Sequence, residues 1–313
     1  MADKPSRGLV LYGDGLARFI NSSHTHLHSF ASRACCGFLS LPHSPPSESE
    51  DARIVREFAE LLDASEAYVS MSGEDTSKVA CQGKSLMPTI SERFMGMRAA
   101  IVTDNPSLRS FGGKLGFTVL QLVDLIDSSH PLAESPHDVV VSELLRLLGF
   151  QGGKTLEASQ YDLVLVHMVA GEKSNGGKNM KSVHGLVGEL MHMAEPGSEI
   201  GSRLHISLVM SYGTVSENDD LSLSVLNTNQ QTNLSLLFPR QSYTMKGGHP
   251  RENVRHHCPM LIAQWQHAVT RKDLAETFSF RDFKEHGGNL TIPADRFLHE
   301  VAFKLWKAPK YGA

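Results

Sequence analysis

The sequence predicts an α/β fold with a mostly parallel central sheet and helices on both of its faces. Short apolar runs suited to buried strands alternate along the chain with segments of helical periodicity, which is typical of parallel sheets. The clearest strand candidates are residues 9–12, 99–103, 161–168 and 205–213. The 313 residues, of which 41% are hydrophobic, suffice for one or two domains with a sizeable core.

Helical segments are expected between these strands. Residues 51–63 place their apolar side chains on one helix face, and Ser47 with Glu50 has the spacing of a capping box. Ser135 is the expected N-cap of a helix that has Pro136 in its first position. The other predicted elements are strands at 118–122, 234–239 and 258–265, a helix at 180–193, an irregular polar segment at 66–89, and an amphipathic C-terminal segment at 291–306.

Composition excludes several classes of protein. A formal net charge of -4 argues against a general nucleic-acid binder, which would carry a basic excess. No apolar run approaches the ~18 residues needed to span a membrane, and the N-terminus resembles neither a signal nor a transit peptide, so we expect a cytoplasmic protein. Cys35, Cys36, Cys81 and Cys258 lack metal-ligand spacing and are expected to be buried thiols.

Familiar nucleotide and hydrolase motifs are missing. No GxGxxG, GxxxxGK[ST] or GxSxG pattern occurs. The stretch "NGGKNMKS" predicts a Gly-rich turn into a helix, or alternatively an anion site with Lys173 and Lys178 nearby. His24, His26 and His28 would share one face of a strand and could then bind zinc; in a polar loop they would be solvated or hydrogen-bonded.

Asp14 is the first candidate functional residue. In "RGLVLYGDGLARFI" it ends a buried apolar run and lies between Gly13 and Gly15. Ligands and metals of α/β proteins sit at the carboxyl ends of the strands, where this residue is expected. Asp14 is therefore either a metal ligand or a polar residue that closes a strand turn.

Several segments, taken in order, resemble one family. They are "LVLYGDGLARF", "THLHSFASRACCGFLSL", "RAAIVTDNPSLRSFGGKLGFTVLQL", "YDLVLVHM", "HISLVMSYGT" and "HHCPMLIAQW". Together they resemble the archaeal-type, cofactor-independent phosphoglycerate mutases of the alkaline phosphatase superfamily. The resemblance implies an alkaline-phosphatase-like core at 1–63 and 126–313, with a reduced, partly irregular cap-like insertion at 64–125. It also implies two metal ions, manganese or zinc, and a serine nucleophile.

The metal ligands implied by this resemblance are mostly missing. Asp14 matches the first-strand Asp of the family, and Glu172 lies where another ligand is expected. The family's Asp-His pair is absent from "LVMSYGT", and the last histidine ligand is His249, His256 or His257. A two-metal site needs more ligands than these, whereas Asp14, Glu172 and one histidine such as His249 or His256 suffice for a smaller site.

The sequence also offers candidates for the nucleophile and for anion binding. The resemblance places the nucleophile before the helix at 51–63, where Ser47 and Ser49 are available, but neither has a convincing Gly-Ser-Asp context. The stretch "KGGHPRENVR" contains Lys246, Arg251 and Arg255, which could hold a phosphate or another anion, or belong to a solvated loop.

Two hypotheses of function follow. The first is a catalytically degenerate, phosphoglycerate-mutase-like pseudoenzyme, without a bound cofactor, that binds, regulates or scaffolds. The second is a metal-dependent phosphoesterase or phosphotransferase with a reduced manganese or zinc site. The expected ligands are a protein partner or a phosphorylated small molecule, and neither nucleic acid nor a membrane. The polar stretch at 216–233, with alternating apolar residues, predicts an exposed hairpin for such a partner.

Overall fold

The computed structural model describes residues 6–45, 47–72, 87–125, 136–170, 176–215, 243–288 and 291–309. Several predictions concern residues outside these ranges. They are the strand at 234–239, the hairpin at 216–233, the cap Ser135, and the side chains of Cys81, Glu172 and Lys173.

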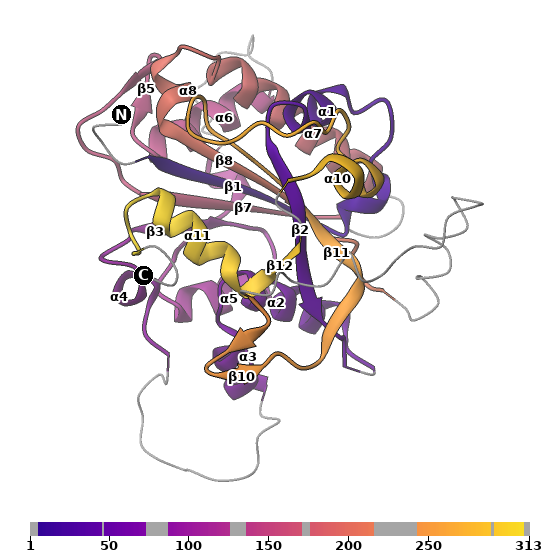
Figure 1. Cartoon of the computed structure of the whole chain (residues 1–313). Helices are drawn as coiled ribbons and strands as arrows, with labels where there is room; N and C mark the ends of the chain where they lie inside the picture. The colour runs from indigo at the N-terminus through magenta and orange to yellow at the C-terminus, as the bar shows by residue number, and fades with distance from the viewer. Residues whose placement is uncertain are drawn as a thin grey trace.

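In the described part of the chain, eight strands form one central sheet in the order β12-β2-β11-β8-β1-β7-β3-β4 (Figure 1). Their bounds are β1 (Arg7–Asp14), β2 (Cys35–Pro42), β3 (Ala99–Val102), β4 (Thr118–Leu120), β7 (Leu163–Val169), β8 (Leu204–Met210), β11 (Val254–Trp265) and β12 (Thr291–Pro293). β11 runs antiparallel to both of its neighbours, and the other neighbouring pairs are parallel. The predicted mostly parallel α/β sheet is confirmed.

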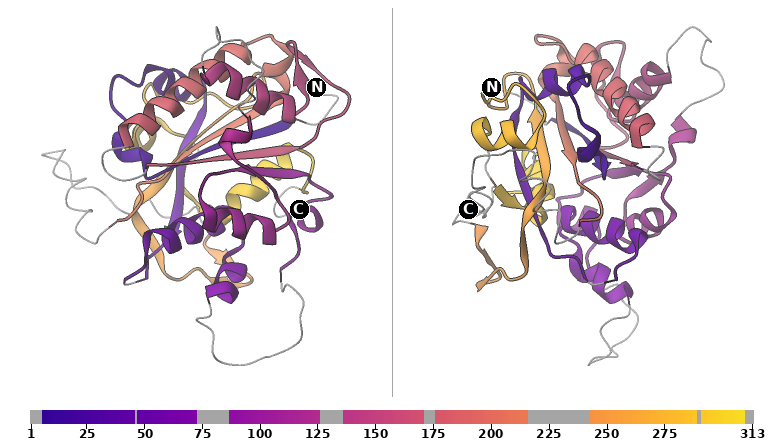
Figure 2. Two further views of the ribbon diagram at one scale, coloured as in Figure 1. Left: turned by 180° about the vertical axis from the view of Figure 1, so that it is seen from behind. Right: turned by 90° about the vertical axis from the view of Figure 1, so that its right-hand side faces the viewer.

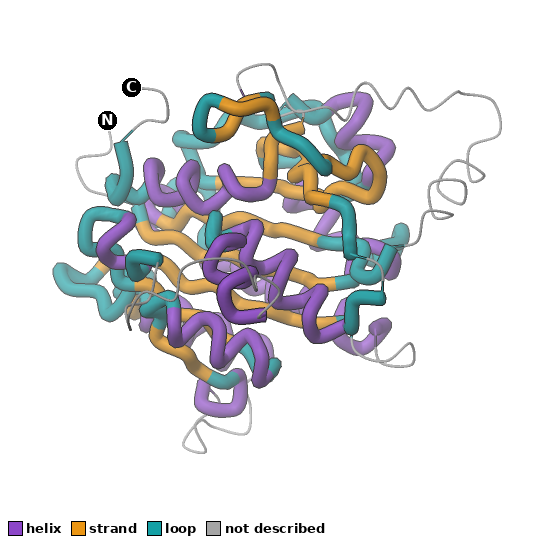
Figure 3. Tube along the Cα trace, turned by 90° about the horizontal axis from the view of Figure 1, so that it is seen from below, coloured by secondary structure: helices purple, strands orange, loops and turns teal. Residues whose placement is uncertain are grey.

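Helices cover both faces of this sheet, and the strands lie side by side between them (Figures 2 and 3). One face is covered by α1 (Thr25–Ala31), α6 (Pro136–Leu147), α7 (Gly176–Met193), α8 (Glu199–Arg203) and α10 (Phe280–His286). The other is covered by α2 (Glu50–Leu61), α3 (Ser65–Ser72), α4 (Ile90–Arg93), α5 (Pro106–Lys114) and α11 (Phe297–Lys304).

Shorter elements complete the described part. Two small hairpins pair β5 (Phe150–Gln151) with β6 (Lys154–Thr155), and β9 (Met245–Lys246) with β10 (His249–Pro250). Three 3-10 turns are η1 (Leu16–Phe19), η2 (Leu122–Leu125) and η5 (Ala294–Arg296).

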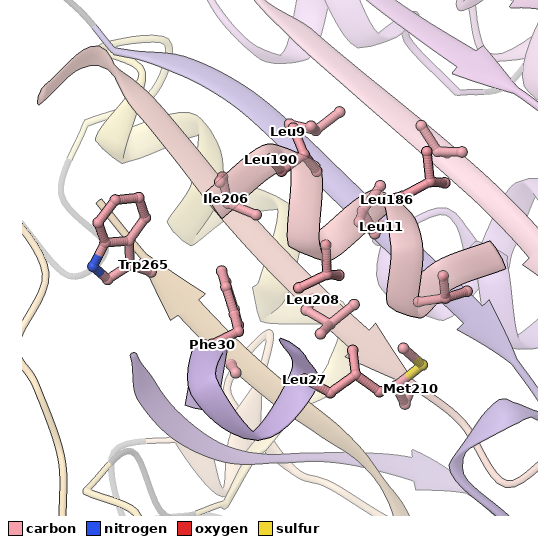
Figure 4. Packing of buried hydrophobic residues seen from close by; sticks show 14 of the residues in the cluster. Leu9, Leu11, Leu27, Phe30, Leu186, Leu190, Ile206, Leu208, Met210 and Trp265 are labelled. Atoms are coloured by element: carbon pink, nitrogen blue, oxygen red, sulfur yellow. The ribbon is translucent and has the colours of Figure 1, made fainter. Parts of the chain in front are cut away.

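The alternation of side chains along β1 divides the core into two layers. Leu9 and Leu11 point to the layer of α1 and α7, whereas Val10 and Tyr12 point to the layer of α2. Figure 4 shows Leu9 beside Leu190 and Leu11 beside Leu186, both leucines of α7, in the first layer. Because both faces of β1 are buried, its sequence is a continuous apolar run rather than an alternating one.

The N-cap of α2 is not the residue that the sequence predicts. The side chain of Ser49, not that of Ser47, caps the helix, because Ser49 Oγ accepts a hydrogen bond from the backbone N–H of Ala52. Ser47 has a left-handed backbone conformation with φ 65° and belongs to the preceding turn. The carboxylate of Glu50 binds Arg53 instead of forming a capping box.

Three further segments differ from the sequence-based expectations. The histidines of "HTHLH" are not on a strand: His24 is the N-cap of α1, and His26 and His28 lie inside that helix. Part of the segment at 66–89, expected to be irregular, continues the helix α3. The stretch "CCGFLSLP" forms β2, an interior strand that was missed among the predicted elements.

The division of the chain into a core and a cap-like insertion at 64–125 stays a prediction. Within that range, β3 and β4 extend one side of the central sheet, with β3 paired to β7 and β4 at the edge. These two strands therefore share the same sheet as β1.

Replacement of Ser49 by Ala should lower the free energy of unfolding by about 1 kcal/mol, because it leaves an N-terminal amide of α2 without its cap. Ser47→Ala is the matched control and should change stability much less, since that side chain is not the cap. Urea denaturation of both variants measures the difference. An equal loss in the two variants would contradict the assignment of the cap.

Candidate functional site at the strand ends

The candidate site lies at the edge of the sheet where the parallel strands end. Asp14 is the last residue of β1, His167 lies near the end of β7, and Ser211 directly follows β8. The register pairs Gly13 of β1 with Met210 of β8, so these ends lie level with one another. This is the edge at which α/β proteins bind their ligands.

The carboxylate of Asp14 is fully buried and is bound by an arginine from α2. Arg53 Nη1 lies 2.9 Å from Asp14 Oδ1, and Nη2 lies 3.0 Å from Oδ2, so the contact is bidentate. The arginine side chain is only 3% exposed. Two parallel charge-assisted hydrogen bonds hold the carboxylate in one orientation.

Two glutamates of α2 hold the guanidinium from the helix side. Glu50, three residues before Arg53, accepts from Nη2 at 2.6 Å and from Nε at 3.0 Å. Glu57, one turn after Arg53, accepts from Nη1 at 3.0 Å and is fully buried. The i,i+3 and i,i+4 spacings bring these side chains together on one helix surface. Arg53 therefore contacts three carboxylates.

Ser211 connects Asp14 to the turn that follows β8. Its hydroxyl donates to Asp14 Oδ1 at 2.9 Å and accepts from the backbone N–H of Gly15 at 3.0 Å. Gly15 and Gly213 both have positive φ, and a Cβ added at Gly213 would lie 3.1 Å from the Cα of Gly15. Glycine at both positions lets the two turns approach this closely.

His167 lies on the other side of the Asp14 carboxylate. Its Nδ1 is hydrogen-bonded to Thr103 Oγ1 at 2.9 Å, and its ring packs 5.6 Å from the ring of Tyr12. Its buried Nε2 lies 3.7 Å from Asp14 Oδ2 and has no hydrogen-bond partner among the described residues. The imidazole is thus positioned by Thr103 while its second nitrogen faces the acid.

The pKa values of the two buried acids, Asp14 and Glu57, are shifted in opposite directions. Burial alone would raise the pKa of Asp14, but the contacts with His167 and Arg53 outweigh it and hold that pKa well below its usual value. Burial dominates at Glu57 and raises its pKa to about 7, with repulsion from Asp14 acting in the same direction. Asp14 is the ionised member of this pair, and Glu57 is the one that binds a proton more readily.

Sequence reasoning did not find Arg53, although it carries most of the contacts of Asp14. The signal available was an Arg and a Glu four residues apart within the helix at 51–63. Such pairs usually lie on a solvated helix face, so the pattern by itself does not distinguish a buried pair from an exposed one.

The predicted histidine ligands lie on later segments. His249 is an exposed residue of the hairpin strand β10, and His256 belongs to β11. Among the described side chains, those bonded to Asp14 are Arg53 and Ser211, with His167 nearby. Asp14, His249, His256 and Glu172 as a set of metal ligands stay a prediction.

The predicted anion-binding residues are engaged by carboxylates. Lys246 and Arg251 both bind Asp295, with Lys246 Nζ at 2.9 Å and Arg251 Nη1 at 2.8 Å from its Oδ2. Arg255 is buried, donates to the backbone carbonyl of Cys258 at 3.0 Å, and lies 3.8 Å from Glu57. An incoming anion would have to compete with these internal acids.

A metal ion does not fit beside Asp14 as the side chains are arranged. Both oxygens of Asp14 accept from the guanidinium, and Oδ1 also accepts from Ser211. In the ranges that the structure describes, no three His, Cys, Asp or Glu side chains are grouped to hold a metal. The positive charge next to this carboxylate comes from Arg53.

A cavity of about 290 Å³ opens beside the site, at the ends of β3 and β7. Thr103, Asp104, Asn105, His167 and Asn179 contribute polar groups to its lining. Its described lining contains a carboxylate and neither Lys nor Arg, which favours uncharged polar ligands over phosphate esters.

Sequence comparisons find no relative. No protein-family model matches the chain, and no curated protein sequence matches it. Solved structures do match. The PH0037 protein from Pyrococcus horikoshii is similar with a TM-score of 0.57 at 12% identity, covering 99% of both chains. The lipoteichoic acid synthase LtaP from Listeria monocytogenes is similar with a TM-score of 0.52 at 10% identity, covering 99% of this chain and 74% of that chain.

A protein in the alkaline phosphatase superfamily from Vibrio parahaemolyticus also matches, with a TM-score of 0.47 at 9% identity, covering 97% of this chain and 67% of that chain. The chain shares its predicted, mostly parallel α/β fold with the PH0037 protein and with LtaP. At these identities the similarity concerns the fold alone.

Asp14→Asn should lower the free energy of unfolding by about 3 kcal/mol, because removal of one partner leaves the buried charge of Arg53 poorly compensated. The matched control is Glu143→Gln, which removes a carboxylate from an ion pair with the half-exposed Arg146 and should cost less than about 0.5 kcal/mol. Chemical denaturation at neutral pH measures both. Equal effects would show that the Asp14 pair behaves like a surface pair.

Glu57 should make the protein less stable as the pH rises from about 4.5 to about 7. Because its pKa is raised in the folded state, folded Glu57 keeps its proton in this window while unfolded Glu57 has lost it. Glu57→Gln should remove this fall. The free energy of unfolding of the wild type minus that of the variant should therefore decrease as the pH rises. The midpoints of urea denaturation, measured across this pH range, report the difference. The control Glu143→Gln should show the same pH dependence of stability as the wild type. A difference that grows with pH would contradict the raised pKa.

Proposed function

We propose that this chain is a catalytically degenerate, phosphoglycerate-mutase-like protein that acts by binding, as a regulatory or scaffolding protein. The observation that carries the proposal is the bidentate contact of Arg53 with Asp14, the residue that matches the family's first metal ligand. A guanidinium supplies positive charge but offers no coordination site for a substrate oxygen.

In metal-dependent phosphoryl transfer a metal pair has two tasks, and the contact of Arg53 with Asp14 bears on both. Two divalent ions neutralise the oxygens of a phosphate and activate the attacking nucleophile. The Arg53 side chain is 3% exposed and its donors are directed at Asp14, Glu50 and Glu57, so it cannot take over either task.

The other predicted catalytic groups support the same proposal. Ser49 is the N-cap of α2, where its hydroxyl accepts from the backbone, and Ser47 lies in the turn before it. Lys246 and Arg251 are bound to Asp295 rather than presented together to an anion. Binding would instead use the strand-end cavity, whose lining suits an uncharged polar group of a small molecule or of a protein partner better than a phosphorylated molecule.

None of the helices in the described part of the chain is both long and apolar enough to cross a membrane. A cytoplasmic location is part of this proposal and is based on the composition of the chain.

A metal-dependent phosphoesterase or phosphotransferase with a reduced site is the second candidate. It is favoured by His167, whose Nε2 is buried, has no hydrogen-bond partner among the described residues, and faces Asp14 at 3.7 Å. Manganese or zinc would be its cofactor, and the ion would have to displace Arg53 from the carboxylate.

The test is the metal content of the untagged wild-type protein, measured by elemental analysis after incubation with manganese or zinc, together with hydrolysis of phosphomonoesters and phosphodiesters. We expect less than stoichiometric metal and no hydrolysis above the buffer rate. Asp14→Ala should behave in the same way. One ion per chain in the wild type, lost in Asp14→Ala, would support the second candidate and refute the first.

A further inference from the structure

We propose that Arg7, Arg203, Arg98 and Lys307 form a binding site for a phosphate group at the amino edge of the sheet, the side on which the parallel strands begin. Arg7 and Arg203 would donate hydrogen bonds to the phosphate, and Arg98 and Lys307 would add positive charge beside them. The amino edge is opposite to the strand ends that carry Asp14. The inference therefore goes beyond the proposed function and rests on different residues.

The first observation is the alignment of four charged residues where neighbouring strands begin. β8, β1, β7 and β3 lie side by side in the sheet and run in the same direction (Figure 1). Arg7 is the first residue of β1, and Arg203, Asp162 and Arg98 directly precede the other three strands. The register places these four residues within one residue of the same level. Since neighbouring strands are about 5 Å apart, their long side chains come within reach of one another.

The second observation is that two of these arginines have donors to spare. The side chains of Arg7 and Arg203 are half-buried and form neither a hydrogen bond nor an ion pair with another described residue. Nε of Arg7 is itself buried without a partner. Glu199, one turn before Arg203 on α8, accepts instead from the backbone N–H of Thr155 at 2.9 Å. Buried donors are normally hydrogen-bonded, so an acceptor from a ligand would satisfy a real deficit.

The third observation is an excess of positive charge. Asp162 is the acid bound within this group, and it is already engaged by Arg98 Nη2 at 3.0 Å and by Lys307 Nζ at 3.3 Å. Burial lowers the pKa of Arg7, and Arg203 and Arg98 lower it further, whereas Asp162 acts in the opposite direction. One carboxylate thus faces four cations, in a chain whose formal net charge is -4. A bound anion would compensate this local excess.

The donor set indicates which anion the site would take. Planar guanidinium groups match the oxygens of phosphates and carboxylates, and a phosphate offers three acceptor oxygens and more than one negative charge. Two arginines without acceptors and a surplus of several charges therefore favour a phosphate over a single carboxylate. The Arg98 side chain is 53% exposed, so the site is open to solvent. Inorganic phosphate and a small phosphate ester present the same group to it.

The experiment titrates the full chain with inorganic phosphate and with methyl phosphate, followed by phosphorus NMR at low ionic strength. Arg7→Gln and Arg203→Gln should each weaken binding about tenfold, because each removes charge-assisted hydrogen bonds. Added sodium chloride should weaken binding to the wild type, since the site is partly exposed. Tighter binding of methyl phosphate would identify a phosphorylated small molecule as the ligand, and tighter binding of inorganic phosphate would identify the free ion; both support the site.

Arg281→Gln is the matched control. It changes the net charge by the same amount, but Arg281 lies on α10, is 72% exposed and pairs with Glu285 at 3.1 Å. This variant should bind phosphate as the wild type does. Equal weakening by Arg281→Gln would overturn the proposal, because the effect would then follow from net charge alone. Unchanged binding in both Arg7→Gln and Arg203→Gln would overturn it as well.

Thermal unfolding provides a second readout. In phosphate-free buffer Arg7→Gln should unfold at the temperature of the wild type, because the guanidinium holds no described residue in place. Phosphate should raise the unfolding temperature of the wild type and of Arg281→Gln, but raise that of Arg7→Gln and Arg203→Gln much less. An equal rise in all four proteins would overturn the proposal.

A peptide of glutamate residues tests the other class of ligand. Wild-type protein that binds this peptide but neither phosphate compound would overturn the phosphate site and indicate an acidic protein segment as the ligand. Neither failure touches the proposed function, because Asp14 and Arg53 take no part in the site at the amino edge.

Discussion

The buried contact between Arg53 and Asp14 is the interaction on which the candidate site depends. Neither charge is tolerable alone in the interior, because the loss of hydration of each must be offset by the other and by further hydrogen bonds. Glu50, Glu57 and Ser211 provide those bonds. The contact therefore joins α2, the end of β1 and the turn after β8 into one rigid unit.

In this protein, different residues form the core of the fold and the polar site at the strand ends. The sheet order and the two helix layers need only apolar side chains on both faces of the strands, and Leu9, Leu11, Val10 and Tyr12 of β1 supply them. The side chains at the strand ends are polar and are held by hydrogen bonds rather than by apolar packing, so the apolar layers do not by themselves determine which polar groups stand there.

The strands that could be predicted from the sequence are those with a strong local pattern of apolar residues. The predicted strands at 9–12 and 161–168 contain the continuous apolar runs 9–12 and 163–166, and these runs lie in β1 and β7. β2 was missed because "CCGFLSLP" contains Gly, Ser and Pro, which weaken the local signal, and its pairing with β11 and β12 is non-local. The same limit applies to "HTHLH", where tertiary packing decided for a helix.

The sequence by itself determined the α/β class and placed Asp14 at the end of the first strand, since both follow from local patterns of apolar and flexible residues. Only the tertiary structure decided what Asp14 binds. Its partner lies 39 residues away on α2, and the contact exists because that helix packs on the face of the sheet next to β1. Burial then sets the strength of the contact, and burial is a property of the assembled layers.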